Sequence, residues 1–435
     1  MSLSRSESRQ REKLNRKQKQ RRSLSLFLIL IGSAIVVFGA WLMLNGGDGI
    51  GGGGGNQPSD LAANGNVGSN DHGPEQSSEA GDGNEDGEPS APNDPTEEAG
   101  PTPTTAPVTD ETGVDEGQAG EEEAVSMSFV GDMLPGEYLN PLMKQNGFDY
   151  PYRNTLLYLS EPDITAGNLE LPITLGGTPI IGTPYVYKGH PEALPAIKDA
   201  GFDVLSLANN HAMDQGVEGM QDTIKHLNEA GIGFMGTGSN DKEAFKPHIV
   251  EAKGLKVAFV GISRVIPYTE LKADRNTPGI AETYDTTRAV ASISGAKKNA
   301  DLVVVMVHWG DDGAEQPVDY QKTNARAYID AGADLVIGAH PHVLQGFEMY
   351  KGKWIAYSLG NFIFSVYPKG TQAETGVLDA ACTRQGDCKL KFNPMIVMEG
   401  QPTPLRGDKA AAMLDRLTSI SHGARLDQEG YLVAE

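Results

Sequence analysis

The chain has 435 residues, of which 22% are charged, 39% hydrophobic and only 7% aromatic, and its formal net charge is −22. The charge is unevenly spread: residues 1–22 carry nine Lys and Arg against two Glu, residues 46–123 carry nineteen Asp and Glu without a Lys or Arg, and residues 124–435 keep a net charge of −10. An acidic body lacks the basic surface that displaces phosphate counterions, which excludes a nucleic-acid partner.

Residues 24–44 are a 21-residue stretch without a charged side chain, and about 20 apolar residues are needed to cross a bilayer. The alternative is a cleaved secretion signal, whose apolar core usually spans about 7 to 15 residues and ends at an A-x-A-like site. The region around Gly39 and Ala40 matches such a site poorly. The basic flank at residues 1–23 is typical of a cytoplasmic N-terminus. We therefore expect a single-pass anchor in the cell membrane, with the rest of the chain outside the cell.

Residues 45–123 are rich in Gly, Pro, Ser, Asn and acidic residues and contain almost no large apolar side chain. Such a segment cannot bury enough surface to offset its conformational entropy. Like charges along it favour extension. The composition predicts a disordered acidic linker that holds the following domain away from the membrane.

The remaining residues alternate between helical stretches and short apolar strands, and a Gly stands where each helix should end. This unit occurs three times, at residues 192–207, 219–235 and 318–337. Further runs rich in Val, Ile and Phe, at residues 125–130, 256–262, 302–307 and 354–359, are typical of buried strands. The alternation predicts an α/β fold for residues 124–370.

Polar side chains follow several of these strands, at the ends that face the ligand crevice in open α/β sheets. They are Asp132, Glu170, the run Asn209-Asn210-His211 with Asp214, His308, and the pair His340 and His342. Taken singly, each is more often a cap, a turn residue or a structural histidine. Together, imidazole, carboxylate and amide donors suit Mn, Fe or Zn, and a shared carboxylate can bridge two ions. The set predicts two divalent transition-metal ions.

In the same order, six motifs resemble the CapA family, also called the PgsA family, of bacterial capsule and poly-γ-glutamate synthesis proteins, a branch of the calcineurin-like metallophosphoesterases. The motifs are Gly131-Asp132, Asn168-Leu169-Glu170, Asn209-Asn210-His211, His308-Trp309-Gly310, Gly338-Ala339-His340-Pro341-His342 and Ser358-Leu359-Gly360-Asn361-Phe362. The resemblance covers about residues 124–365. It implies two mixed β-sheets packed as a sandwich and flanked by helices.

The resemblance also assigns roles, and its six metal ligands are Asp132, Glu170, Asn210, His308, His340 and His342. It makes His211 the residue that protonates the leaving group, which Asp214 could orient. Asn209 and Asn361 are candidate substrate contacts, although Asn361 could simply cap a turn. One departure matters: the usual first motif is D-x-H, but residues 132–134 read Asp-Met-Leu, so one metal position lacks its histidine.

Two functions remain open at this stage. The chain either helps to synthesise or export an anionic capsule polymer, with the polymer and a capsule synthase membrane complex as partners, or is a metal-dependent hydrolase of phosphoesters or amides. The loop at residues 182–189, with Tyr185 and Tyr187, either contacts an anionic substrate or is an ordinary surface loop. In residues 371–435 we expect a hairpin closed by a Cys382–Cys388 disulfide, which can persist outside the cytoplasm, followed by a helical tail.

Overall fold

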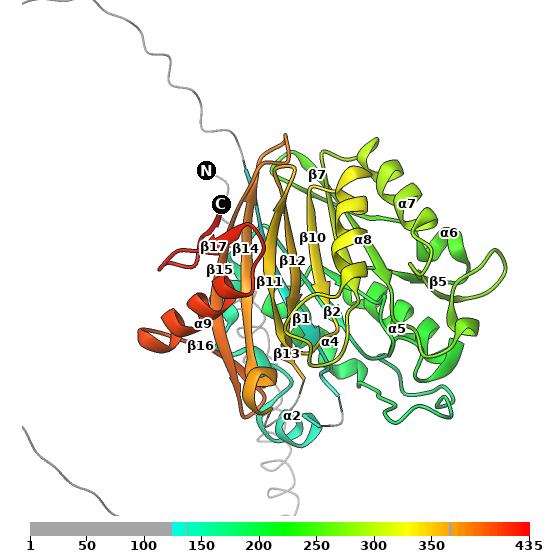
Figure 1. Ribbon diagram of the computed structural model, residues 1–435. Helices are drawn as coiled ribbons and strands as arrows, with labels where there is room; N and C mark the ends of the chain where they lie inside the picture. The colour runs from blue at the N-terminus through cyan, green and yellow to red at the C-terminus, as the bar shows by residue number, and fades with distance from the viewer. Residues whose placement is uncertain (1–123, 137, 365–367) are drawn as a thin grey trace, which may run out of the picture. The chain divides into compact units, whose positions relative to one another are not determined.

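A computed structural model describes residues 124–136, 138–364 and 368–435, which form two β-sheets packed face to face with helices on their outer sides (Figure 1). The expected anchor at residues 24–44 and the expected linker at residues 45–123 lie outside the described residues. Every helix in the described part of the chain is too short or too polar to span a bilayer.

The larger sheet has eight strands and the smaller has six, and both mix parallel and antiparallel neighbours. The larger sheet follows the order β16 (Gln401–Pro404), β15 (Cys388–Met398), β14 (Glu374–Cys382), β1 (Val125–Met133), β2 (Ile164–Leu169), β3 (Val204–Ser206) and β4 (Gly233–Met235), with β13 (Asn361–Ile363) paired to β1. The smaller sheet follows the order β11 (Leu344–Tyr350), β12 (Lys353–Leu359), β10 (Leu335–Ala339), β9 (Leu302–His308), β7 (Leu255–Ser263) and β6 (His248–Ala252). Two short ribbons complete the strands, β5 (Thr237–Gly238) with β8 (Gly279–Ile280) and β17 (Ala424–Leu426) with β18 (Leu432–Ala434).

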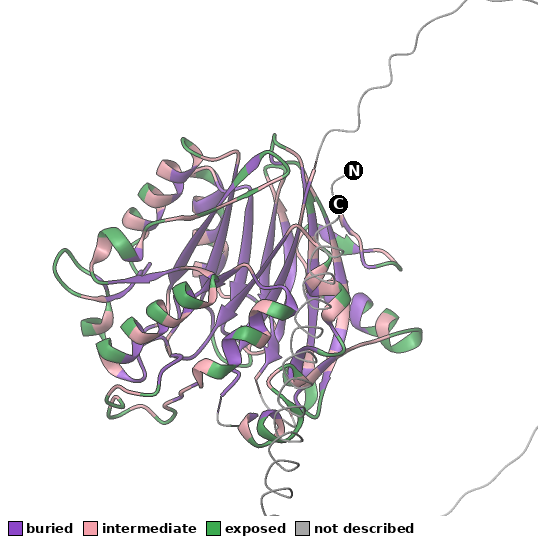
Figure 2. Ribbon diagram, turned by 180° about the vertical axis from the view of Figure 1, so that it is seen from behind, coloured by how far each residue is buried: buried purple, intermediate pink, exposed green. Residues whose placement is uncertain are grey.

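Helices cover the outer faces of the two sheets, except α9 (Asp408–Ser419), which packs against the apolar layer between the sheets. The other α-helices are α2 (Asn140–Asn146), α3 (Leu156–Ser160), α4 (Leu194–Ala200), α5 (Gly216–Ala230), α6 (Asp241–Ala244), α7 (Thr287–Lys297) and α8 (Asp319–Asp330). Short 3₁₀ turns lie at Tyr150–Tyr152, Pro191–Ala193, Thr269–Leu271 and Gly370–Ala373. Figure 2 shows the result, with buried strands inside and helices that expose only their outer sides.

Three layers of apolar side chains hold this arrangement together. The central layer lies between the sheets and includes Phe129 of β1 and Phe259 of β7, both fully buried. A second layer packs α4 and α5 onto the larger sheet, and a third packs α7 and α8 onto the smaller one. Because inner strands such as β9 and β10 are covered on both faces, their sequences are continuous apolar runs. The prediction of two mixed sheets flanked by helices is confirmed for the described residues.

The three predicted helix-Gly-strand units are present, as α4 with β3, α5 with β4, and α8 with β10. The glycines at their helix ends, Gly201, Gly231 and Gly332, all have positive φ angles, of 129°, 66° and 114°. A side chain with a Cβ rarely adopts these angles, so the glycines let each helix end and the chain turn back into the sheet.

The C-terminal segment extends the larger sheet. β14 pairs antiparallel with β1, and β15 pairs with β14 in a register that sets Cys382 opposite Cys388, where the predicted disulfide is formed. Helix α9, the expected helical tail, buries Met413, Leu414 and Leu417 in the central layer. Residues 371–435 therefore share the core of the sandwich.

Candidate metal centre

The predicted ligands lie where strand ends of the two sheets meet. In the larger sheet Asp132 pairs with Asn168 across β1 and β2, and in the smaller sheet His308 pairs with Ala339 across β9 and β10. Asn168 Nδ2 lies 2.8 Å from Asp132 Oδ1 and 3.2 Å from His308 Nδ1, so one amide joins the two sheets. Residues 140 positions apart in sequence, Asn168 and His308, thus converge because parallel strands end at the same edge.

A bulge at the end of β1 directs Asp132 into the site. The register of β1 shifts before Asp132 against β2 and after it against β13, and such bulges turn a side chain out of its regular direction. Gly131 is needed here because a Cβ on it would lie 2.0 Å from the carbonyl oxygen of Gly360. The Gly-Asp motif therefore combines a close backbone approach with a buried carboxylate.

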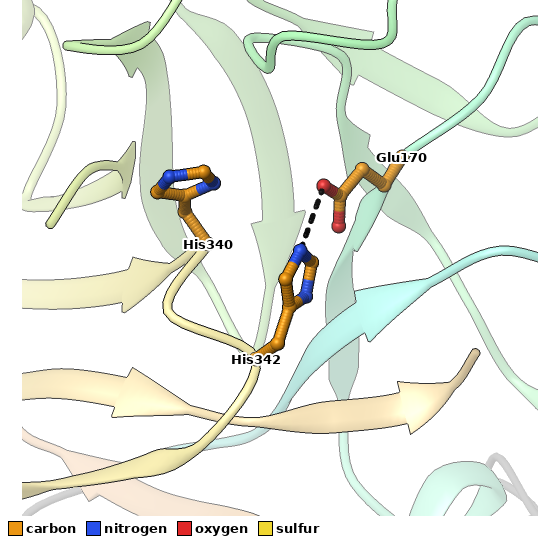
Figure 3. A group of neighbouring side chains, drawn as sticks. All are labelled: Glu170, His340 and His342. Carbon is orange, nitrogen blue, oxygen red and sulfur yellow. Dashed lines mark ion pairs between the residues drawn. The ribbon is translucent and has the colours of Figure 1, made fainter. Parts of the chain in front are cut away.

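Two groups of side chains have donor atoms close enough to hold a metal ion, and Glu170 belongs to both. One group is Glu170, His340 and His342, shown in Figure 3, and the other is Asp132, Glu170 and His308; within each group the donor atoms lie within 4.8 Å of one another. His342 Nε2 is 3.8 Å and His308 Nε2 is 3.6 Å from Glu170 Oε1. A carboxylate common to two donor groups is the arrangement that bridges two ions.

The surroundings of Glu170 in the described structure are unusual for a carboxylate. It is fully buried, and neither carboxylate oxygen has a hydrogen-bond partner among the described residues. Burial, followed by the charge of Asp132, raises the pKa of Glu170 well above its usual value. A buried carboxylate without hydrogen bonds costs several kcal/mol, which is similar to the cost of breaking a buried ion pair. The residues therefore fit bound cations, which would satisfy these oxygens.

The histidines of the site differ in their preferred charge. Burial, together with the neighbouring His342, lowers the pKa of His340 to about 4, and burial likewise lowers the pKa of His308 well below its usual value. Burial also disfavours the charge of His342, but its contact with Asp132, 3.3 Å from Nδ1 to Oδ2, outweighs burial and raises its pKa. For Asp132, burial is outweighed by His342 and His308, so its pKa is lowered. Neutral imidazole and ionised carboxylate are the forms that bind metals.

The turn between the two late histidines is held in an unusual conformation. His340 and His342 have φ angles of 100° and 58°, which few residues other than glycine adopt. Such strain costs about 1–3 kcal/mol for each residue and is concentrated at functional sites. Two contacts hold the turn: His340 N donates to Asp132 Oδ2 at 3.2 Å, and Asn361 Nδ2 donates to the carbonyl oxygen of His342 at 3.1 Å.

A cavity of about 730 Å³ opens over the donor groups. Its polar wall includes Asn210, His211, Asp214, His342 and Asn361, and its apolar wall includes Tyr138, Tyr185, Tyr187, Ile266 and Phe364. The loop at residues 182–189 therefore contributes Tyr185 and Tyr187 to the cavity wall. The contact of this loop with an anionic substrate stays a prediction.

His211 and Asp214 form a pair in this cavity wall. Asp214 Oδ2 is 2.8 Å from His211 Nδ1 and also accepts the backbone N–H of Tyr187 at 2.7 Å. The ring of Tyr187 lies 4.6 Å from the His211 ring. The pair fixes the orientation of the imidazole and leaves its Nε2 without a hydrogen-bond partner among the described residues, as a proton donor would require.

Asn210 and Asn209, the other predicted site residues, lie in different surroundings. Asn210 is a neighbour of the donor groups, with Oδ1 2.7 Å from His308 Nε2. Asn209 is fully buried; it donates to Asn168 Oδ1 and to the carbonyl oxygen of Leu169 and accepts the N–H of His211. Asn209 does not line the cavity described above, so its role as a substrate contact stays a prediction. Leu134, which replaces the expected histidine, is buried in the apolar layer under α4.

Sequence reasoning did not single out two residues of the site. Asn168 belongs to the motif at residues 168–170, but its role follows only from the structure, in which its amide contacts both sheets. Asp312 lies four residues after His308 and lines the cavity, with Oδ1 3.5 Å from His340 Nε2 and 3.9 Å from His342 Nε2. Its position in a loop gives no periodic signal that could have identified it.

The chain is similar to proteins of capsule synthesis. A family model described as "Bacterial capsule synthesis protein PGA_cap" matches residues 126–366. The "PGA biosynthesis protein CapA" of Bacillus subtilis (strain 168) is 34% identical over 315 residues, which are 72% of this chain and 82% of that protein. The "Capsule biosynthesis protein CapA" of Bacillus anthracis is 34% identical over 295 residues, 66% of this chain and 70% of that protein.

Among solved structures, the sulfate thiohydrolase SoxB of Thermus thermophilus is similar over 68% of this chain and 60% of its own. The TM-score is 0.37 and the sequence identity 12%. A likeness of this size carries no argument about function.

Proposed function

Because the chain belongs to the bacterial capsule synthesis protein PGA_cap family, we propose that it acts in the biosynthesis or export of an anionic capsule polymer such as poly-γ-glutamate, through a metal site at the sheet ends. The family match covers most of the described domain, from residue 126 to residue 366. Two relatives with 34% identity carry names that refer to capsule or PGA biosynthesis.

Glu170 is the single observation that carries the metal part of this proposal. A fully buried carboxylate that is common to two donor groups, and whose oxygens accept no hydrogen bond from the described residues, needs cations. Asp132, Glu170, Asn210, His308, His340 and His342 would hold two divalent ions. When bound, such ions supply Lewis acidity and positive charge to an anionic group of the substrate.

The cavity explains why a polyanion would need those ions. The charged side chains of its described lining are Asp214, Asp312 and Lys369, besides histidine, and Asp132 and Glu170 lie beneath. Without cations, this surface would repel a chain of carboxylates. The tyrosines of the apolar wall suit the methylene groups between the carboxylates of a glutamyl polymer. We infer that the polymer meets the cations with its carboxylates and the tyrosines with its backbone.

The location belongs to the same proposal. An uncleaved anchor at residues 24–44 with an acidic linker at residues 45–123 would place the domain outside the cell, next to a membrane complex that synthesises the polymer. The capsule synthase complex is then the expected protein partner.

Hydrolysis is the second candidate function, and the His211–Asp214 pair favours it. This pair lies in the cavity wall outside both donor groups and presents a free Nε2, the position of a general acid. The substrate would be a phosphoester or an amide of the cell envelope.

One set of strains tests the capsule function. Cells that lack the gene are complemented with the wild type, Glu170→Gln, His211→Ala, or His226→Ala as a control. His226, like His211, has a carboxylate neighbour three residues later, with Nδ1 3.4 Å from Glu229 Oε2. This second pair lies on α5 and does not line the cavity. We expect polymer yield to fall with the first two variants only. Normal yield with Glu170→Gln would refute the capsule function through this site.

A further inference from the structure

Asp312 lines the cavity beside the two late histidines and has no other partner among the described residues. Its Oδ1 is 3.5 Å from His340 Nε2 and 3.9 Å from His342 Nε2. These separations are too long for hydrogen bonds, and the carboxylate makes none within the described residues. The Asp312 carboxylate thus lies near two imidazole nitrogens without a hydrogen bond to either. A gap remains between the carboxylate oxygen and the two nitrogens.

That gap has the size of a metal ion. Two donor atoms that each lie about 2.1 Å from an ion are about 3.0 Å apart at a right angle and about 3.4 Å apart at a tetrahedral angle, with a limit of about 4.2 Å when they lie on opposite sides. The Asp312 separations fall within these limits, as does the 3.8 Å between His342 Nε2 and Glu170 Oε1. The distances from the Asp312 oxygen to the two histidine nitrogens are therefore similar to the distance between the buried donors His342 and Glu170.

The loop that carries Asp312 is attached to the histidine turn itself. The N–H of Gly313 donates to the carbonyl oxygen of Pro341 at 2.8 Å, and Pro341 stands between the two histidines. On the other side, Gln345 Nε2 donates to the carbonyl oxygen of Ala314 at 2.8 Å. The Asp312 side chain is 75% exposed, but its backbone position is set by these bonds.

We propose that Asp312 is an additional carboxylate ligand of the metal centre and completes the donor set that Leu134 leaves short. This inference rests on the metal site of the proposed function. Leu134 stands where a histidine would be expected, is buried among apolar side chains, and has no donor atom. Asp312 supplies an oxygen from the opposite, cavity side. It also adds a third negative charge to those of Asp132 and Glu170, against the four positive charges of two divalent ions.

The test compares Co²⁺ binding to the purified full chain and three variants, by calorimetric titration and by the visible absorption of the bound ion. Asp312→Asn removes the charge and keeps the size. Asp311→Asn is the matched control. Asp311 is adjacent and also exposed, so its substitution removes the same charge at nearly the same place. Asp312→Glu restores a carboxylate, and thermal unfolding of each metal-free variant verifies folding.

We expect Asp312→Asn to weaken one of two Co²⁺ sites by at least about 10-fold and to change the absorption spectrum, because the spectrum reports the donor set. Asp311→Asn should leave both unchanged, and Asp312→Glu should recover part of the affinity. The inference is overturned if Asp312→Asn and Asp311→Asn match in affinity and spectrum, or if the wild type binds no Co²⁺. In the first case the metal site of the proposed function stands, whereas the second removes both. A chain that loads normally but whose Glu170→Gln variant gives full polymer yield would leave this inference intact.

Discussion

Replacing Glu170 by Gln should stabilise the metal-free protein and destabilise the metal-loaded one. Without ions, the carboxyl group is buried and has no hydrogen bond to the described residues, and burial raises its pKa. With ions, the same group is shared by both donor groups. The substitution keeps the size of the side chain but removes its charge, so the two conditions should give effects of opposite sign.

The magnitude follows from proton linkage. A carboxyl group with a raised pKa in the folded state binds its proton more tightly than in the unfolded state, whose reference pKa is 4.5. Its contribution to stability is therefore complete below about pH 4.5 and is lost as pH rises towards the folded pKa, at about 1.4 kcal/mol per pH unit. At pH 7, about 2.5 units above that reference value, the loss reaches at most about 3 to 4 kcal/mol. Metal-free Glu170→Gln should exceed the wild type by up to this amount at pH 7, and match it near pH 4.5.

With bound ions, the wild type should be more stable than Glu170→Gln. An ion present at about 1,000 times its Kd stabilises the folded state by about 4 kcal/mol, and the variant would lose most of this gain. The assay is denaturant unfolding of both proteins at pH 4.5 and pH 7, with a chelator and with Mn²⁺. Glu348→Gln is the control: Glu348 is buried but paired with Arg326 at 2.9 Å and Tyr357 at 2.7 Å, so its loss should destabilise under all conditions. A metal-free Glu170→Gln that is less stable than the wild type at pH 7, or an equal gain from Mn²⁺ in both, would refute the reasoning.

Three further predictions concern other parts of the chain. His211→Ala should keep the metal content measured by elemental analysis, and any turnover of a phosphodiester should fall about 10²- to 10⁴-fold; a fall of only a few-fold contradicts the acid role. Replacing Cys382 and Cys388 by Ser should lower the free energy of unfolding by about 2 kcal/mol, as a loop this short predicts, and equal stability of the oxidised wild type and the double variant would exclude this. Protease added to intact cells should remove the domain, and membrane fractions should contain the full chain; a soluble form that starts near residue 40 would disprove the anchor at residues 24–44.

The sequence predicts the site better than it predicts the sheet order. Strand ends carry polar residues in a recognisable pattern, and parallel strands that end together bring Asp132, Glu170, His308 and His342 into one place. Such a prediction needs no knowledge of which strands are neighbours. The position of β14 beside β1 depends instead on contacts across 250 residues, such as Ser128 with Asp379, which no local pattern reveals.

Other features could not be predicted because they depend on the backbone. The positive φ angles of His340 and His342 occur in residues that usually avoid them, so the sequence gives no sign of the turn that aims both rings. Asp312 lies in a loop whose direction comes from the bond between Gly313 and Pro341. Helix α7 has a weak apolar face, with Ala289, Ile293 and Ala296 buried, and small alanines hide its periodicity.

The pairing of β1 also limits where the chain can be cut. The family match ends at residue 366, yet the N-terminal half of β1, from Val125 to Phe129, has its partner in β14, which begins at Glu374. A fragment that stops at the family boundary would turn half of this central strand into an open edge and uncover Phe129. During synthesis, the strand that carries Asp132 must wait for residues some 250 positions later before its sheet is complete. Expression of the domain should therefore include the C-terminal hairpin, and truncation near residue 366 should yield an aggregating chain.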